Sequence, residues 1–277
     1  MNRISVTWGV LVVLGLVSCG DRVRVTSDDR AEAVEMLAKQ ASGVAPRGYQ
    51  ALPEAAGMGK AGVCAELLRM GVPVDSRGAA GETALMRAAG GGYGRVVRLL
   101  LQHGAQTDAR DLAGETALMR AAAGGYSLVV HTLLEHGADV NAFDKDRYTV
   151  LMWAAGKGRE SVVRELIARG AAVNTADKDG YTALMRAAFC GRARVAEMLL
   201  KAGADVHATT HAGWPALMWA AWKGHTPIVR LLVEHGAALN ARDAHGNTAL
   251  MHAAARGHSD TVRLLKELGA DERGRDE

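Results

Sequence analysis

The chain has 277 residues, of which 49% are hydrophobic and 23% are charged, a balance typical of folded globular proteins. Its 33 basic and 30 acidic residues leave a formal net charge of +3, which is too close to neutral to favour nucleic acid or an anionic membrane surface as a partner. With only five Trp, five Tyr and two Phe, the core must be built mainly from aliphatic side chains.

The first 18 residues have the anatomy of a secretory signal peptide. Arg3 precedes an apolar run from Trp8 to Val17, and a short polar segment follows. A run of this length cannot cross ~30 Å of hydrocarbon as a helix, which takes about 20 residues. We therefore expect residues 1–18 to direct export and to be removed, with an uncleaved anchor helix as the alternative.

The residues that end this segment, Leu16-Val17-Ser18-Cys19, resemble the lipobox of bacterial lipoproteins. The resemblance implies cleavage before Cys19, lipidation of Cys19 and attachment of the chain to a membrane. Gly20 stands where the sorting rules of that family place an aspartate for retention at the inner membrane, which implies the outer membrane instead. The alternative is an ordinary signal peptide that contains a cysteine, and a soluble periplasmic protein.

Residues 19–44 are predicted to form a linker with one capping helix. Ser27-Asp28-Asp29 is typical of a helix start, and a helix through about Ala41 would place Val34, Leu37 and Ala38 on one apolar face. The segment 43–48, which contains two glycines and a proline, ends it. We expect this helix to cover the open end of the repeated units that follow.

From about residue 45 to residue 275 the chain is a series of repeats. One threonine position recurs every 33 residues, at Thr83, Thr116, Thr149, Thr182, Pro215 and Thr248. The threonine is predicted to cap a short first helix, which ends near a glycine. A second helix follows and stops at a Gly-Ala pair, because glycine adopts the left-handed conformation at little cost. A fixed period of this size predicts units that bury their apolar faces against their neighbours.

These units, with Thr-x-Leu-x-x-Ala-Ala, Gly-Ala-Asp and Val-Asn-Ala at a period of 33 residues, resemble the ankyrin repeat. The resemblance covers about residues 45–275 in seven units, of which the first is divergent and the last is shortened. It implies an all-α ankyrin-repeat solenoid of helix-turn-helix units that binds other proteins and has no enzymatic activity. We therefore divide the chain into residues 1–18, 19–44 and 45–275.

Three departures from the family pattern carry structural predictions. Methionine replaces the usual histidine, as in Met86, so that adaptable packing is expected in place of a polar contact. Arg147 occupies the position of the turn glycine, at a cost on the order of 1 kcal/mol if the turn keeps its positive φ. Pro215 replaces the capping threonine and loses about 1 kcal/mol of cap.

One face of the first helices is predicted to look outward. At 100° per residue, Trp153 and Gly156 lie opposite Leu151, Ala154 and Ala155, so the position after the methionine faces away from the stack. In ankyrin proteins this face and the adjoining turns form the concave, recognising surface. The predicted partner-binding residues on it are Arg87, Arg120, Tyr148, Trp153, Tyr181, Arg186, Phe189, Trp214, Trp219 and Trp222.

Aromatic and arginine side chains are enriched at the centres of protein interfaces, because they bury a large area at little cost in entropy. The seven rings in this set fall in three adjacent units, which predicts a binding patch there. The alternative is that some rings only pack on neighbouring turns. A second alternative is a small-ligand or glycan site that uses Trp214, Trp219 and Trp222.

Other motifs favour no chemistry. The segment 57–62 matches the dinucleotide fingerprint, but it falls in the predicted loop between two helices, where no strand precedes it. The histidines follow the period of the repeat and not the spacing of a metal site, so neither a metal nor a cofactor is expected. Cys64 and Cys190 lie four units apart, beyond disulfide reach at roughly 10 Å per helix pair. Cys190 is treated as an inert loop residue, with a reactive thiol as the alternative.

The sequence therefore predicts a non-enzymatic ankyrin scaffold that is lipid-anchored through Cys19 at the bacterial cell envelope. Its partner is expected to be another protein, held on the concave face.

Overall fold

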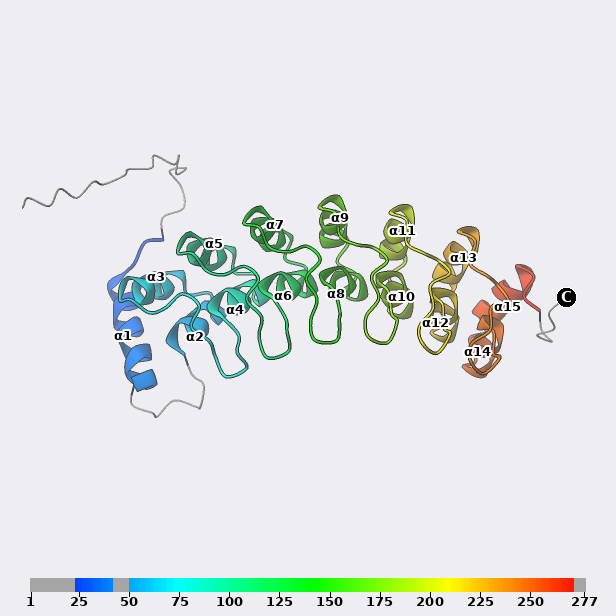
Figure 1. Cartoon of the computed structure of the whole chain (residues 1–277), viewed down its shortest axis with the longest axis horizontal. Helices are drawn as coiled ribbons and strands as arrows, with labels where there is room; N and C mark the ends of the chain where they lie inside the picture. Colours follow the sequence, from blue (N-terminus) through cyan, green and yellow to red (C-terminus); the bar gives the residue numbers. More distant parts are fainter. Residues whose placement is uncertain (1–22, 42–49, 272–277) are drawn as a thin grey trace, which may run out of the picture.

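A computed structural model describes residues 23–41 and 50–271, so the predicted signal peptide and Cys19 lie outside the described residues. Helices are the only regular elements in these two ranges (Figure 1). In chain order they are α1 (Ser27–Ala41), α2 (Ala51–Gly57), α3 (Ala61–Arg69), α4 (Ala84–Gly90), α5 (Gly94–Gln102), α6 (Ala117–Gly124), α7 (Ser127–Glu135), α8 (Val150–Lys157), α9 (Glu160–Ala168), α10 (Ala183–Phe189), α11 (Ala193–Lys201), α12 (Ala216–Trp222), α13 (Thr226–Glu234), α14 (Ala249–Ala255) and α15 (Ser259–Glu267).

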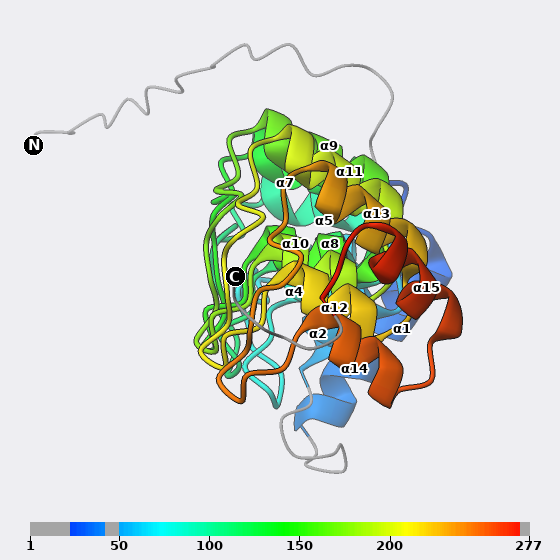
Figure 2. The same ribbon diagram turned by 90° about the vertical axis from the view of Figure 1, so that its right-hand side faces the viewer.

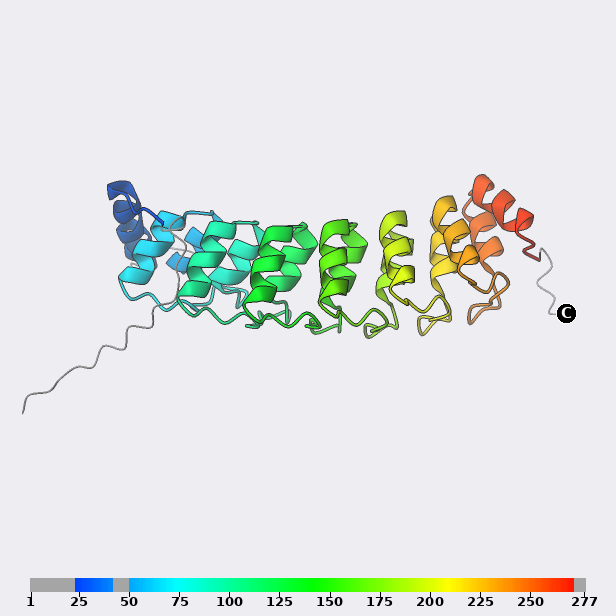
Figure 3. The same ribbon diagram turned by 90° about the horizontal axis from the view of Figure 1, so that it is seen from above.

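The helices from α2 to α15 form seven pairs that stand side by side in one row (Figure 3). The first helix of each pair packs against the first helix of the next, and the second helices do the same, so the array has two layers (Figure 2). The row is bowed, and the layer of first helices lies on its concave side (Figure 1). The predicted all-α solenoid of helix-turn-helix units is confirmed.

Small and aliphatic side chains hold the two layers together. Each first helix from α2 to α12 buries a leucine and an alanine pair, such as Leu85, Ala88 and Ala89, which are at most 1% exposed. The alanines allow neighbouring helices to approach closely, and the leucines and valines of the second helices fill the space between layers. Because every unit repeats this pattern, the core is continuous along the row.

The threonine caps form as predicted. The Thr83 hydroxyl accepts a hydrogen bond from the Met86 amide at 3.3 Å, and the same bond caps α6, α8, α10 and α14. Pro215 precedes α12 without a side-chain cap, also as predicted. The expectation that methionine offers only packing was wrong in two units. The Met86 and Met152 sulfurs accept hydrogen bonds from the cap amides at 3.4 and 3.5 Å, since the thioether folds back over the first turn.

The turn at Arg147 keeps the conformation that glycine adopts in the other units. Its φ of 61° makes Arg147 the one residue other than glycine with a positive φ in the described ranges. The Arg147 guanidinium lies 5.6 Å from the centroid of the Phe143 ring. This cation–π contact offsets part of the strain that a side chain meets in the left-handed region.

Helix α1 covers the N-terminal end of the row, where it packs against α3 and α2 (Figure 1). Its cap is Thr26, one residue earlier than predicted. The Thr26 hydroxyl accepts from the Asp29 amide at 3.1 Å, and the Asp29 carboxylate accepts from the Thr26 amide at 2.8 Å. The predicted apolar face was wrong in part: Leu37 is half-buried against the core, but Ala33 and Met36 are the buried residues and Val34 is 55% exposed. The helix is rotated so that the larger Met36 side chain reaches the core.

The C-terminal end of the row has no such cover among the described residues. Ala254 is exposed and Val262 is half-exposed, although the equivalent Ala89 and Val97 of the second unit are fully buried. In every earlier unit these positions are covered by the unit that follows. The last pair, α14 and α15, therefore presents an apolar end face.

Candidate functional site

The position after each methionine lies on the concave side at the surface of the first helices. Arg87, Arg120, Trp153, Arg186 and Trp219 are all half-exposed, while the alanines beside them are buried. The helical periodicity therefore placed these residues correctly on the outer side of the layer. What they contact differs between the two halves of the array.

Five rings from α10, α12 and the turns before these two helices form one continuous cluster in the C-terminal half, which we call the aromatic cluster. Trp214 and Trp219 have centroids 4.4 Å apart, and Tyr181 lies 5.3 Å from Trp219. Phe189 lies 5.5 Å from Trp219 and 6.1 Å from Trp222. All five rings are half-exposed, so they pack on one another and still present surface.

Two further rings, Tyr148 and Trp153, pair with each other at 4.8 Å in the fourth unit. Arg186 links this pair to the aromatic cluster, because its guanidinium lies 4.8 Å from the Tyr148 ring and 3.9 Å from the Tyr181 ring. Burial raises the pKa of Tyr148 to about 12, so its phenol is neutral at physiological pH. The seven predicted rings thus form one chain of contacts across three units.

Two cations border the aromatic cluster. The Lys223 ammonium lies 4.4 Å from the Phe189 centroid and 4.6 Å from the Trp222 centroid, and the Arg256 guanidinium lies 4.5 Å from the Trp222 centroid. In the described part of the chain neither cation has a carboxylate within 4.0 Å. The sequence analysis missed this positive border, although Lys223 and Arg256 occupy equivalent positions one period apart.

The three arginines predicted to bind a partner are already ion-paired within the array. Arg87 lies 2.5 Å from Glu54 and 3.5 Å from Glu82. Arg120 lies 2.6 Å from Asp111 and 3.2 Å from Glu115, and Arg186 lies 2.6 Å from Asp177. Each of the three side chains is about a quarter exposed, so part of its surface remains open to a ligand.

In the third, fifth and seventh units, the aspartate that begins the turn has two functions. In the third unit one oxygen of Asp111 accepts from the Ala113 and Glu115 amides, which fixes the turn. Its other oxygen binds the Arg120 guanidinium nine residues later. The same pairing recurs at Asp177–Arg186 and Asp243–His252. In the sequence, the constant spacing of nine residues is the signal that indicates this pairing.

The seventh unit uses histidine in this pairing. His252 Nε2 lies 2.8 Å from an Asp243 carboxylate oxygen, and its ring lies 4.1 Å from the Trp214 ring. Burial by itself raises the pKa of Asp243, but hydrogen bonds from the Asn247 and His245 amides and from His252 hold it below its ordinary value. The Asp243 carboxylate therefore stays ionised beside the aromatic cluster.

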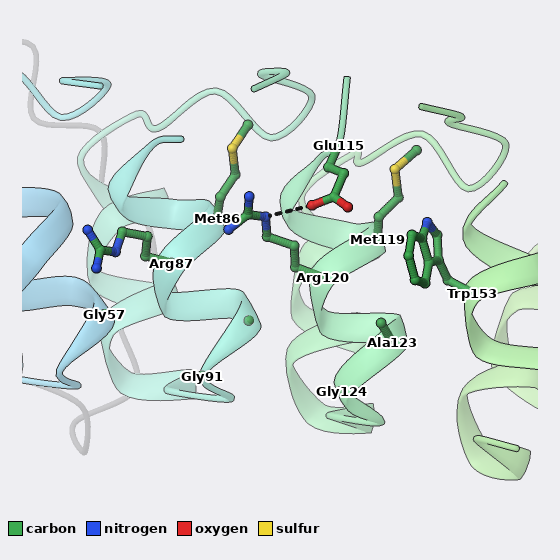
Figure 4. A pocket seen from close by; sticks show the side chains of 11 residues that line it. Gly57, Met86, Arg87, Gly91, Glu115, Met119, Arg120, Ala123, Gly124 and Trp153 are labelled. Atoms are coloured by element: carbon green, nitrogen blue, oxygen red, sulfur yellow. Dashed lines mark ion pairs between the residues drawn. The ribbon is translucent and has the colours of Figure 1, made fainter. Parts of the chain in front are cut away.

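The N-terminal half has a hollow where the C-terminal half has rings (Figure 4). It is an open cavity of about 580 Å³ over α4 and α6. The hollow is lined by Gly57, Met86, Arg87, Gly90, Gly91, Glu115, Met119, Arg120, Ala123, Gly124 and Trp153. Its floor is formed by glycine and alanine at the ends of the first helices, which leave the space between the arginines and Trp153 unfilled.

Two histidines bind backbone carbonyl groups of the preceding unit. His225 Nε2 contacts the Phe189 carbonyl at 3.2 Å, and His258 Nε2 contacts the Trp222 carbonyl at 2.9 Å. Burial lowers the pKa of His225. Arg159 donates to the Ala123 carbonyl from the equivalent position at 3.1 Å. These side chains therefore tie α9, α13 and α15 to the first helix of the preceding unit. No group of His, Cys, Asp or Glu in the described residues has the arrangement of a metal site.

The remaining motifs are also structural. The segment 57–62 spans the end of α2, the loop and the start of α3, and Gly59 takes a positive φ of 73° in that loop. Cys64 is buried, which raises the pKa of its thiol to about 12, and Cys190 is half-exposed. Of the helices that the structure describes, none is long and apolar enough to cross a bilayer.

Stacked pairs of short helices, joined by turns that project from one edge, define a repeat solenoid with one continuous concave face. A family model described as ankyrin repeats in three copies matches residues 52–144, 141–210 and 204–276, so the chain belongs to the ankyrin repeat family. The crystal structure of the human ASB11 ankyrin repeat domain is similar, with 27% sequence identity and a TM-score of 0.72. That match covers 78% of this chain and 96% of the human domain.

A search of curated proteins found no match to the chain. Ankyrin repeats generally act as scaffolds for protein–protein interaction without enzymatic activity, and no enzyme family is indicated here.

Proposed function

We propose that this protein is a non-enzymatic ankyrin scaffold that binds another protein on its concave face, and that a lipid on Cys19 anchors it at the bacterial cell envelope. The observation that carries the first part is the chain of seven half-exposed rings across α8, α10 and α12. The signal-like residues 1–18 and the lipobox resemblance support the second part.

The helix pairs of this fold form without such rings in other units. In the second and third units the equivalent positions hold glutamate, arginine, glycine and alanine, and the same helix pairs form there. In addition, the indole N–H groups of Trp153 and Trp219 are buried without a hydrogen-bond acceptor, which costs about 1–3 kcal/mol for each group. Large rings that the stack does not need, and that leave polar groups unsatisfied, are explained by recognition of a partner.

The lipid anchor would restrict the scaffold to a membrane surface and raise the effective concentration of partners there. One acyl chain binds only marginally, whereas the several chains of a bacterial lipoprotein hold firmly. Because Gly20 follows the cysteine, we propose the outer membrane as the site of anchoring. The repeat domain would then lie outside the cytoplasm.

Cell fractionation tests the anchor. The Cys19→Ser variant removes the thiol that would carry lipid, and it should move the protein from the membrane fraction to the soluble fraction. Labelling with a radioactive fatty acid should be lost in the same variant. A Cys19→Ser protein that stays in the membrane fraction would refute the lipoprotein part of the proposal, and an unlabelled wild type in the soluble fraction would favour a free periplasmic scaffold.

Photocrosslinking in intact cells tests partner binding. A photoreactive amino acid at Lys223, on the border of the aromatic cluster, should give a discrete adduct with another protein that mass spectrometry identifies. The matched control is Arg230, which is exposed on α13 in the layer of second helices. Adducts of equal yield at both positions, or none at position 223, would contradict concave-face binding.

The rings are less suited to a glycan. Trp214, Trp219 and Trp222 are inclined to one another by 43°, 77° and 89°, so they do not form a flat platform for a sugar ring. Calorimetry with cell-wall fragments tests this alternative. Saturable binding that Trp222→Ala removes would replace the protein-binding proposal for this surface.

A further inference from the structure

We propose that the hollow binds a basic side chain, arginine or lysine, of the partner protein. This inference rests on the proposed function and specifies the chemistry of the partner at a second region of the same face. Three observations support it: the excess of carboxylates that pair with its arginines, an aromatic ring at one end, and, in the turn before the helix that carries this ring, a carboxylate without its cation.

The arginines of the hollow are outnumbered by carboxylates. Arg87 is shared between Glu54 and Glu82, and Arg120 is shared between Asp111 and Glu115. Each guanidinium therefore meets two carboxylates, so the two arginines and their four carboxylates have a formal net charge of −2 beside the hollow. Glu115 is the carboxylate in the lining, its side chain is 27% exposed, and it is placed to pair with an incoming cation as well as with Arg120.

The fourth unit lacks the cation that the pattern requires. Asp111, Asp177 and Asp243 each bind an arginine or histidine nine residues later. Asp144 fixes its own turn by accepting hydrogen bonds from the Asp146 and Tyr148 amides. The residue nine positions later is Trp153, which cannot form the ion pair that an arginine or histidine forms in the other units.

The sixth unit shows the balanced alternative. There Trp219 also replaces the cation, and the aspartate is replaced by the neutral Thr210. Within the described units, only the fourth therefore keeps the carboxylate and gives up its cation. A basic group from the partner would restore the pairing that the other units make internally.

Trp153 supplies a ring surface for that group. Figure 4 shows Glu115 and Arg120 above the floor of the hollow and the Trp153 ring at its far end. Cations lie over aromatic rings elsewhere on the same face, as Arg186 does over Tyr181 and Lys223 over Phe189. A guanidinium or ammonium between Glu115 and Trp153 would combine an ion pair with a cation–π contact.

The shape of the hollow fits a long, flexible side chain. Gly90, Gly91 and Gly124 give a floor without side chains, and the methionines of the lining are apolar and adaptable. The methylene stem of an arginine or lysine can lie along this floor while its charged end reaches Glu115. A bulky branched side chain has no comparable ion pair to gain there.

Selection from a phage-displayed library of random peptides tests the proposal. The purified full chain in detergent is the bait, and parallel selections use Glu115→Gln, Asp144→Asn and Trp153→Leu. The wild type should enrich peptides with arginine or lysine at one fixed position. Binding of these peptides should weaken at least fivefold with Glu115→Gln and with Trp153→Leu, and by a smaller factor with Asp144→Asn.

Glu135→Gln is the matched control, because Glu135 is also ion-paired to an arginine but lies on α7 in the outer layer. Thermal melts confirm that every variant is folded. If no selected peptide has a fixed basic position, or if Glu115→Gln leaves its affinity unchanged, the basic anchor is refuted. Peptides that Lys223→Glu loses but Glu115→Gln retains would refute the anchor and leave protein binding by the concave face intact.

Discussion

The two halves of the concave face differ in the size of their side chains, and the backbone that carries them is the same. The last two residues before the loop glycine are Gly90 and Gly91 in the second unit but Trp222 and Lys223 in the sixth. In the first case the face is hollow, and in the second it is covered by stacked rings. The shape of the face is therefore set by side-chain size at these positions, independently of the helix pairs that support it.

The two halves also differ in charge. The arginines around the hollow are each shared by two carboxylates, whereas Lys223 and Arg256 lie over rings with no carboxylate close by in the described residues. The concave face thus has a negative region and a positive region. A protein that covers both must present basic groups at one end and acidic groups at the other.

The largest expected difference between the halves concerns the tryptophans. Trp219 contacts four other rings, and Trp153 contacts one. Trp219→Ala should therefore lower the free energy of unfolding by about 3 kcal/mol, and Trp153→Ala by about half as much. Urea unfolding followed by circular dichroism measures both. Equal losses would show that the rings of the aromatic cluster do not support one another.

The turn aspartates Asp177 and Asp144 should also contribute unequally to the free energy of unfolding. Asp177→Asn breaks a buried ion pair with Arg186 and should cost about 1.5 kcal/mol, since hydrogen bonds to charged groups contribute about 1.5–3 kcal/mol. Asp144→Asn keeps the oxygen that fixes its turn and has no cation to lose, so it should cost under about 0.5 kcal/mol. Thermal unfolding measures the stability of the two variants. A larger loss of stability for Asp144→Asn than for Asp177→Asn would contradict the view that only Asp177 has a cation partner to lose.

Acid should weaken the packing next to the aromatic cluster. The pKa of Asp243 is lower in the folded chain than its ordinary value, so its carboxylate stabilises the fold at pH above about 4. That stabilisation is lost as the pH falls below this value and through the folded pKa. Because His252 joins Asp243 to Trp214, tryptophan fluorescence should report the change. An acid transition that Asp243→Asn leaves unaltered would argue against this coupling.

The smallest expected effect is in the hollow. Gly90 lies in a helix, and a Cβ there would meet Arg120 side-chain atoms at 3.6 and 3.8 Å, which is ordinary contact. Gly90→Ala should therefore stabilise the protein by about 0.5–1 kcal/mol. Gly92→Ala is the control and should destabilise it, because Gly92 has a φ of +72° and its Cβ would approach the Tyr126 ring to 2.5 Å. A calorimetric melt distinguishes the two.

Much of the fold could be predicted from the sequence because it depends on local chemistry. The period, the threonine caps and the positive φ at Arg147 each involve residues close together in the chain. The predicted rotation of α1 was wrong because its apolar residues can form two different apolar faces. Which face is buried depended on how Met36 meets α3, and no pattern within the helix encodes that contact.

The candidate site was predictable in its positions but not in its contacts. Helical periodicity placed Trp153 and Trp219 on the surface correctly. It did not show that Arg186 would lie between Tyr148 and Tyr181, because that contact depends on the spacing between units. The hollow was missed because glycine and alanine carry no signal for binding, and the space appears only when two arginines and a tryptophan stand around it.

The uncovered end face of the last unit has a consequence for how the stack loses order. In a linear array each unit is supported by its neighbours, and α14 and α15 have a neighbour on one side among the described residues. Fraying should start there and travel inward, so amide protons should exchange fastest in α15 and progressively more slowly toward α8. A protein bound across Trp214 and Arg256 would hold the last units together, so it would slow amide-proton exchange at this end while it is bound.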